Sequence, residues 1–317
     1  MDGLDRADIQ RSSGDEHEFV NGISRYMKRK LIITADDYGM CEAVNQAIEE
    51  CLAAGTLRAT CVMTNMPAYS ATTSLRQTFP NVSLGIHWTL TDGYPVLLPS
   101  QVPTLVTHDG GFLSVIELRR RWLKRQINVA ELKDELRAQY KRFREVAGSP
   151  DFWNTHENFH VFPGLFATCV SLGQELCIPI MRCHRRYTVP RDYSLISYNL
   201  RYPLFYLKGW GIGRWSRHAE RQGMLMPDGI IHMPGYEPTI ASIEHVIKSL
   251  PWGTIHRPVE LVIHPATTSN DRLFRLNADR RVHEYQIFKN ADLVERLYQN
   301  NIEITDFRSL TGQYKSA

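Results

Sequence analysis

The chain lacks several features that would place it in common functional classes. None of its 317 residues lie in a run long and apolar enough to span a bilayer, and residues 1–29 are polar, without the apolar core of a secretory signal. Its 37 basic and 34 acidic side chains are interspersed, so no broad basic face for nucleic acid is indicated. We therefore predict a cytoplasmic protein with a disordered leader over 1–29, no membrane span and no nucleic-acid partner.

Cysteine is also sparse, and its spacing excludes two further classes. None of the six cysteines forms a C-x-x-C pair that would indicate zinc-finger or redox chemistry. They lie among apolar residues, which favours buried free thiols in a reducing compartment. They are Cys41, Cys51, Cys61, Cys169, Cys177 and Cys183.

From Lys30 onward, short apolar runs alternate with amphipathic segments, which is typical of βαβ units around a parallel sheet. We predict strands at 30–35, 58–64, 82–90, 152–156, 179–184, 259–265 and 302–307, and helices at 41–55, 114–147, 163–177, 241–250 and 291–300. The range 187–236 is rich in aromatics, Gly and Pro with little periodicity. We interpret it as an insertion or lid over the site, or as a peripheral subdomain. A single α/β domain over 30–317 follows.

Acidic and imidazole side chains fall where predicted strands end. Asp36 and Asp37 follow the apolar run "LIIT", and His87, His156 and His264 close three later strands. Because parallel strands share one C-terminal edge, where α/β enzymes build their sites, we expect these five side chains to surround one polar centre.

This set of side chains matches metal-assisted hydrolysis. Two histidines and a carboxylate are a common zinc ligand set, which Asp37, His87 and His156 supply. Asp36 would take a proton from a metal-activated water, and His264 would protonate the leaving amine.

Each of these residues also has a structural explanation. The Asp pair precedes a predicted helix, where Asp is a favoured cap. His156 and His160 are four residues apart, so on a helix both would share one face, and Asp37, His156 and His160 would be the ligands instead. On a strand end and loop, His160 would lie behind the ligands or face substrate. Trp88, next to His87, is expected in the core or pocket wall, with sugar stacking as the alternative.

Four motifs carry a resemblance to a known family. "TADDYGMCEAVNQAI", "SLGIHWTL", "NTHENFHVFP" and "LVIHPAT" occur in the order and spacing of the YdjC family of carbohydrate deacetylases, which includes chitooligosaccharide deacetylases and hopanoid-associated relatives. The resemblance covers Lys30 to Leu310. It implies a (β/α) barrel-like fold related to polysaccharide deacetylases, with the site at the C-terminal strand ends. It also implies removal of acetyl groups from N-acetylated sugars with zinc or magnesium.

The resemblance also implies roles for single residues. Asp37, His87 and His156 would be the metal ligands and Asp36 the catalytic base. His264 would be catalytic or stabilise the transition state. Arg182 matches a family position near the substrate, where it would hold an oxyanion or a sugar hydroxyl.

One motif departs from the family pattern. Where the family commonly has D-S-H-x-H-x-H, this chain has N-T-H-E-N-F-H over 154–160, so Asn154 replaces an acidic partner and Asn158 replaces the middle histidine. An amide still accepts from an imidazole N–H but adds no charge, so metal affinity or substrate choice is expected to differ. Tyr38 stands where Phe is usual.

The leading hypothesis is a metal-dependent N-deacetylase of an acetylated amino sugar in a small glycoside, oligosaccharide or glycosylated precursor. Zn²⁺ is the expected metal, with Mg²⁺ as the alternative, and we also allow for a homodimer. Two other functions stay open: a non-catalytic metal- or sugar-binding relative, and a metal-dependent hydrolase of another bond such as a phosphoester. The absence of a Gly-rich phosphate loop counts against the phosphoesterase.

Overall fold

The computed structural model describes residues 29–187, 203–233, 238–268, 274 and 278–313. Its sheet has seven parallel strands in the order β4-β3-β2-β1-β6-β5, with β7 pairing with the start of β1. The strands are β1 (Arg29–Tyr38), β2 (Ala59–Val62), β3 (Ser83–Trp88), β4 (Phe152–Thr155), β5 (Gly229–His232), β6 (Val259–Ile263) and β7 (Ile302–Thr305). Of the predicted leader, residues 1–28 lie outside the described residues and Arg29 already begins β1.

A segment after β4 connects the two edges of the sheet. Met181 bridges Trp153 of β4, and Arg186 bridges Ile230 of β5, both in parallel. The predicted strand at 179–184 therefore forms isolated bridges instead of a continuous ladder. Because these bridges join the edge strands, the sheet closes into a barrel-like wall, and the predicted fold class is confirmed.

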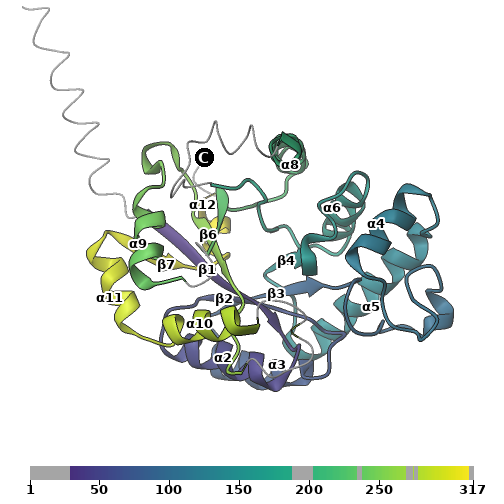
Figure 1. The fold of residues 1–317 in the computed structure, drawn as a ribbon, viewed down its shortest axis with the longest axis horizontal. Helices are drawn as coiled ribbons and strands as arrows, with labels where there is room; N and C mark the ends of the chain where they lie inside the picture. The colour runs from purple at the N-terminus through teal and green to yellow at the C-terminus, as the bar shows by residue number, and fades with distance from the viewer. Residues whose placement is uncertain (1–28, 188–202, 234–237, 269–273, 275–277, 314–317) are drawn as a thin grey trace, which may run out of the picture.

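Helices surround this wall (Figure 1). They are α2 (Glu42–Ala53), α3 (Thr72–Thr78), α4 (Val115–Leu123), α5 (Val129–Ala147), α6 (Leu165–Glu175), α8 (Pro203–Arg221), α9 (Ile240–Lys248), α10 (Ala278–Phe288), α11 (Asp292–Gln299) and α12 (Ser309–Gln313). The single helix predicted over 114–147 is wrong. Arg125 takes a left-handed φ of 56°, and the Asn128 side chain accepts from the Ala130 N–H to start a second helix.

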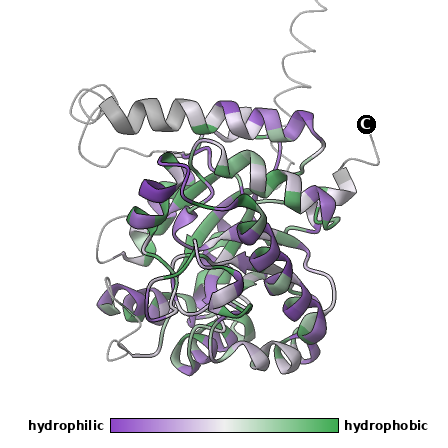
Figure 2. Cartoon of the chain, turned by 90° about the vertical axis from the view of Figure 1, so that its right-hand side faces the viewer, coloured by the Kyte–Doolittle hydropathy of each residue, from purple (hydrophilic) through white to green (hydrophobic). Residues whose placement is uncertain are grey.

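The range 187–236 contains part of the barrel itself. Strand β5 lies in it and pairs in register with β6, so this part is not an insertion. Strand β5 is preceded by helix α8, which runs along the outside of the molecule (Figure 2). The low periodicity of the sequence concealed both elements. Residues 188–202 and 234–237, where a lid was also expected, lie outside the described residues.

The cysteines and the helices bear on two predictions made from composition. Cys51, Cys61, Cys169 and Cys183 are buried and form no disulfide, as expected, whereas Cys41 is half-buried and Cys177, in a left-handed turn after α6 at φ 57°, is exposed. No helix in the described part of the chain is both long and apolar enough to cross a membrane.

Candidate active site

The end of β1 is irregular, and this irregularity brings two adjacent carboxylates to one cleft. Pairing between β1 and β2 shifts register between Ala35 and Tyr38. Asp37 has a left-handed φ of 74°, a conformation that Asp tolerates better than most residues. In a regular strand, neighbouring side chains would point to opposite faces, but here both Asp36 and Asp37 line the cleft.

The interpretation of the Asp pair as helix caps is wrong. Helix α2 has Cys41 at its N-cap position, and no side chain caps it. The turn before α2 is instead held by Asn45, whose Oδ1 accepts from the Gly39 N–H at 2.6 Å. The two carboxylates are therefore available for other contacts.

Asp37 contacts two histidines, one at the end of β3 and one directly after β4. Its Oδ1 lies 3.2 Å from His87 Nε2 and 3.1 Å from His156 Nδ1. One ligand atom from each of these three residues falls within 4.8 Å of the others, as a single bound cation requires. The second Asp37 oxygen accepts from Arg281 Nη2 at 2.5 Å. Donor types and positions thus fit a divalent metal held by Asp37, His87 and His156.

These contacts set the charge on Asp37. Burial alone would raise its pKa, but Arg281 and His156 outweigh burial and hold the pKa of Asp37 well below its usual range. The carboxylate is ionised at neutral pH, which metal ligation also requires.

The structure places His87, and not His160, beside Asp37 and His156. Residues His156–Asn158 form one 3₁₀ turn, in which Glu157 takes a left-handed φ of 50°, so His156 and His160 do not share a helix face. His160 is fully buried, and its Nδ1 pairs with Thr155 Oγ1 at 2.6 Å. Among the described residues, the three-residue ligand groups contain His87 and not His160.

Asp36 is bound on both oxygens by one guanidinium. Arg182 Nη1 and Nη2 donate to Asp36 Oδ2 and Oδ1 at 2.6 and 2.7 Å. On its other side, Arg182 donates to Glu260 Oε1 from Nη2 at 2.8 Å and from Nε at 3.0 Å. Burial would raise the pKa of Asp36, but the charge and hydrogen bonds of Arg182 outweigh it and hold that pKa far below its usual range.

His264 completes the polar centre from the end of β6. Its Nε2 lies 3.8 Å from Asp36 Oδ2, and its backbone N–H donates to Glu284 Oε2 of α10 at 2.5 Å. Desolvation lowers the pKa of His264, opposed by the nearby charges of Asp37 and Asp36. With a side chain 39% exposed, the ring can meet a ligand in the cleft.

The cleft has a volume of about 600 Å³, and it contains all five strand-end residues predicted from sequence. Three other predicted residues, Arg182, His160 and Trp88, are 3%, 0% and 0% exposed and do not line it. Arg182 lies behind Asp36, and Trp88 packs on Trp153 at a ring distance of 5.2 Å. The cleft is lined by Asp36, Asp37, Met40, His87, Asp92, Thr155, His156, Glu157, Asn158, Arg186, His232, Met233, His264, Phe274, Arg280, Arg281 and Glu284.

Sequence reasoning missed two charged residues around the carboxylate pair: Arg281, which donates to Asp37, and Glu260, which shares Arg182 with Asp36. Glu260 interrupts the apolar strand "VELVI", and a carboxylate in a fully buried run needs a buried cation, so its partner could have been sought. Arg281 lies in the mixed run "DRRVHEYQ" and has no comparable signal.

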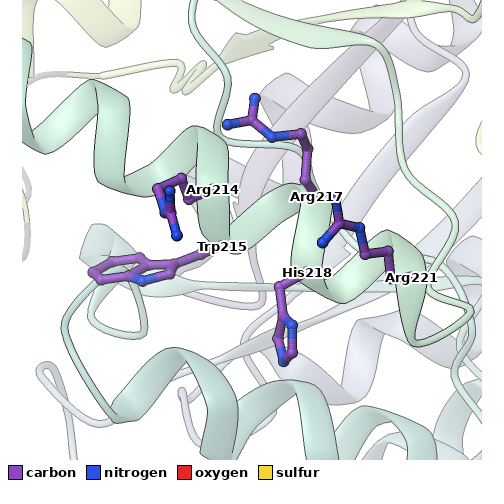
Figure 3. A pocket seen from close by; sticks show the side chains of 5 residues that line it. All are labelled: Arg214, Trp215, Arg217, His218 and Arg221. Atoms are coloured by element: carbon purple, nitrogen blue, oxygen red, sulfur yellow. The ribbon is translucent and has the colours of Figure 1, made fainter.

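A second cavity has a volume of about 380 Å³, and the described residues that line it all belong to α8 and do not line the cleft. Figure 3 shows its lining residues, Arg214, Trp215, Arg217, His218 and Arg221. The part of this lining that the structure describes has a single imidazole and no carboxylate, which is not a donor set for a catalytic metal.

Comparison with known proteins identifies the family. The YdjC-like protein model matches residues 30–299. A carbohydrate deacetylase of Brevibacillus brevis is 26% identical over 285 residues, covering 89% of this chain and 99% of the relative. A chitooligosaccharide deacetylase of Proteus mirabilis is 31% identical over 49% of this chain and 59% of its own length. A solved structure from Enterococcus faecalis, described as a candidate cellobiose-phosphate cleavage protein, shares the fold at a TM-score of 0.68 and 22% identity, covering 90% of this chain and 99% of that one. The protein therefore belongs to the YdjC-like family.

Proposed function

We propose that the protein is a hydrolase that removes the acetyl group of an N-acetylated amino sugar with the help of a divalent metal, Zn²⁺ or Mg²⁺. The observation that carries this proposal is the placement of Asp37, His87 and His156 around one point, with Asp36 and His264 facing the same cleft. The names of the relatives, carbohydrate deacetylase and chitooligosaccharide deacetylase, support the same reaction.

The metal would be held by Asp37, His87 and His156. When bound there, a divalent cation supplies Lewis acidity toward the acetyl carbonyl and the attacking water. The chain's own part is to hold this ligand set against the cleft wall, with Arg281 fixing the second oxygen of Asp37.

Asp36 is the proposed base. Because Arg182 keeps its carboxylate ionised, Asp36 is in the protonation state that a general base needs at neutral pH. Arg182 itself is buried and fully engaged by Asp36 and Glu260, so we assign it to holding the base and not to binding substrate.

His264 is the proposed proton donor to the amine. Its lowered pKa makes the imidazole neutral at neutral pH, so it can receive a proton before giving one away. The acceptor site Nε2 faces Asp36 Oδ2 at 3.8 Å. A proton taken from water by Asp36 can therefore pass to His264 and then to the leaving nitrogen, without a net change at either residue.

The test is a panel of N-acetylated amino sugars, mono- and oligosaccharides, incubated with metal-reconstituted full-length protein. Acetate release and a mass loss of one acetyl group are the expected result. The proposal is overturned if the reconstituted protein binds Zn²⁺ or Mg²⁺ at a 1:1 ratio and releases no acetate from any acetamido sugar.

A further inference from the structure

Asn154 lies between the proposed metal ligand His87 and the proposed base Asp36. It is on β4, directly opposite His87 of β3 in the strand register, and is 1% exposed. One end of its amide is 2.5 Å from His87 Nδ1. The other end is 2.8 and 3.0 Å from Arg182 Nη1 and Nη2, and 3.3 Å from both Asp36 Oδ1 and Cys61 Sγ.

The amide satisfies different partners in its two orientations. With oxygen toward His87, it accepts from a ring N–H on Nδ1, and its NH₂ donates to Asp36 Oδ1 and Cys61 Sγ. The NH₂ then also faces the donors of Arg182, which is unfavourable.

In the opposite orientation, the amide oxygen accepts two bonds from Arg182, and the NH₂ donates to His87 Nδ1. Nδ1 is then an acceptor, so the proton of a neutral His87 must be on Nε2. That N–H faces Asp37 Oδ1 at 3.2 Å, so both ring nitrogens of His87 and the guanidinium of Arg182 have partners, and the two bonds from Arg182 offset the 3.3 Å approach of the amide oxygen to Asp36 Oδ1.

Only the first orientation is compatible with a metal on His87. A ligating Nε2 must present its lone pair, which requires the proton on Nδ1 and therefore an acceptor there. We propose that Asn154 is a positioning residue whose amide turns over when a metal binds, moving the proton of neutral His87 from Nε2 to Nδ1. This inference rests on the proposed metal site.

Only an amide can exchange its two ends in this way, because it carries both a donor and an acceptor, whereas an ionised carboxylate carries no donor. Aspartate at position 154 could only accept from Nδ1–H, and would fix His87 in the ligating form whether or not a metal is present. Asparagine instead stabilises the metal-free arrangement through Arg182, at the expense of metal affinity. Because the same amide also contacts Asp36, metal binding at His87 changes the contacts of the base.

The experiment is NMR of full-length protein carrying ¹⁵N-labelled histidine, with the His87 signals assigned by their loss in His87→Gln. Metal-stripped wild type is expected to carry its proton on Nε2 and to transfer it to Nδ1 when Zn²⁺ is added. Asn154→Asp should carry it on Nδ1 in both states and bind Zn²⁺ about tenfold more tightly in a chelator competition. Asn128→Asp makes the same change at a helix N-cap, where Asp also caps, and should behave as wild type.

The results separate this inference from the proposed function. If Zn²⁺ binds wild type and not His87→Gln, but stripped wild type already has its proton on Nδ1, the turnover of the amide is refuted while the metal site stands. An unchanged Zn²⁺ affinity in Asn154→Asp also refutes it. If wild type binds neither Zn²⁺ nor Mg²⁺, the metal site itself is wrong. The wild-type measurement needs no variant to fold.

Discussion

Asp36 and Arg182 form a buried bidentate ion pair, with the two N–O distances at 2.6 and 2.7 Å and both residues under 5% exposed. Because Arg182 pairs with Asp36 and not with Asp37, the two neighbouring carboxylates have different partners. Asp37 faces the two histidines and Asp36 is held by an arginine. Charge-assisted pairs with this fork geometry fix both position and ionisation, so Asp36 is a rigid, charged group at the cleft wall.

Replacing Asp36 by Asn should slow turnover strongly and leave the metal in place. The amide cannot accept a proton from water, and general-base catalysis contributes about 10²–10⁴-fold. We expect kcat for acetate release to fall by about that factor, with unchanged metal content by atomic absorption. Asp134→Asn, which alters an exposed carboxylate paired with Arg137, is the matched control and should keep full activity. Wild-type turnover in Asp36→Asn would remove Asp36 from the mechanism.

The pair His156→Gln and His160→Gln tests which histidine of the 154–160 segment binds metal. His156 Nδ1 faces Asp37, whereas His160 is buried against Thr155 and Trp153. We expect His156→Gln to lose metal and activity together. His160→Gln should keep its metal and lose about 1–3 kcal/mol of unfolding free energy, because a buried hydrogen bond is disturbed. Metal loss in His160→Gln with retention in His156→Gln would reverse the assignment.

Much of the architecture was predictable because strands leave a pattern of apolar residues in the sequence, and the site residues directly follow those runs. The apolar runs predict the strand positions, and parallel strands bring Asp36, His87 and His264 to one edge. The backbone conformation of a single residue was not predictable: the left-handed φ of Asp37 decides where its carboxylate points. Contacts between distant segments were also hidden, as for Arg281, which reaches Asp37 from α10, 244 positions along the chain.

Removing Arg182 should destabilise the metal-stripped protein strongly. Arg182→Met leaves the carboxylates of Asp36 and Glu260 buried without their cation, which costs about 3–5 kcal/mol. Urea unfolding at neutral pH measures this loss. Arg137→Met, which breaks a surface pair with Glu175, should cost less than about 1 kcal/mol. A cost equally small in Arg182→Met would show that the buried pair is not stabilising.

The same pair gives stability a defined pH dependence. In wild type, the pKa of Asp36 in the folded protein lies below its ordinary value of 3.8. The stability that Asp36 contributes is therefore complete above pH 3.8 and is lost as the pH falls through the folded pKa. In Arg182→Met, only the smaller charge effects of His87 and His264 oppose burial, so the pKa of Asp36 is higher than in wild type and its carboxylate is protonated at a higher pH. The difference in unfolding free energy between the two proteins should therefore shrink on acidification. A difference that is constant from neutral pH to about pH 4 would contradict this linkage.

Gly85 should resist substitution although its backbone is ordinary strand. It lies opposite Phe152 in the β3–β4 register, and a Cβ there would meet three ring atoms of Phe152 at 2.5, 2.6 and 2.7 Å. That ring cannot move away freely, because it stacks on Phe307 at a centroid distance of 3.8 Å. We expect Gly85→Ala to lose about 1–3 kcal/mol in urea unfolding through overpacking.

Gly253→Ala is the matched control for this substitution, because a Cβ at Gly253 would contact nothing within 4 Å. It should change stability by less than about 0.5 kcal/mol. Since His87 is two residues beyond Gly85 on the same strand and face, Gly85→Ala should also displace that ring and weaken Zn²⁺ binding in a chelator competition, which Gly253→Ala should not. Equal stability and equal Zn²⁺ affinity in the two variants would mean that the Phe152–Phe307 stack yields readily, and that β3 does not depend on glycine to place its ligand.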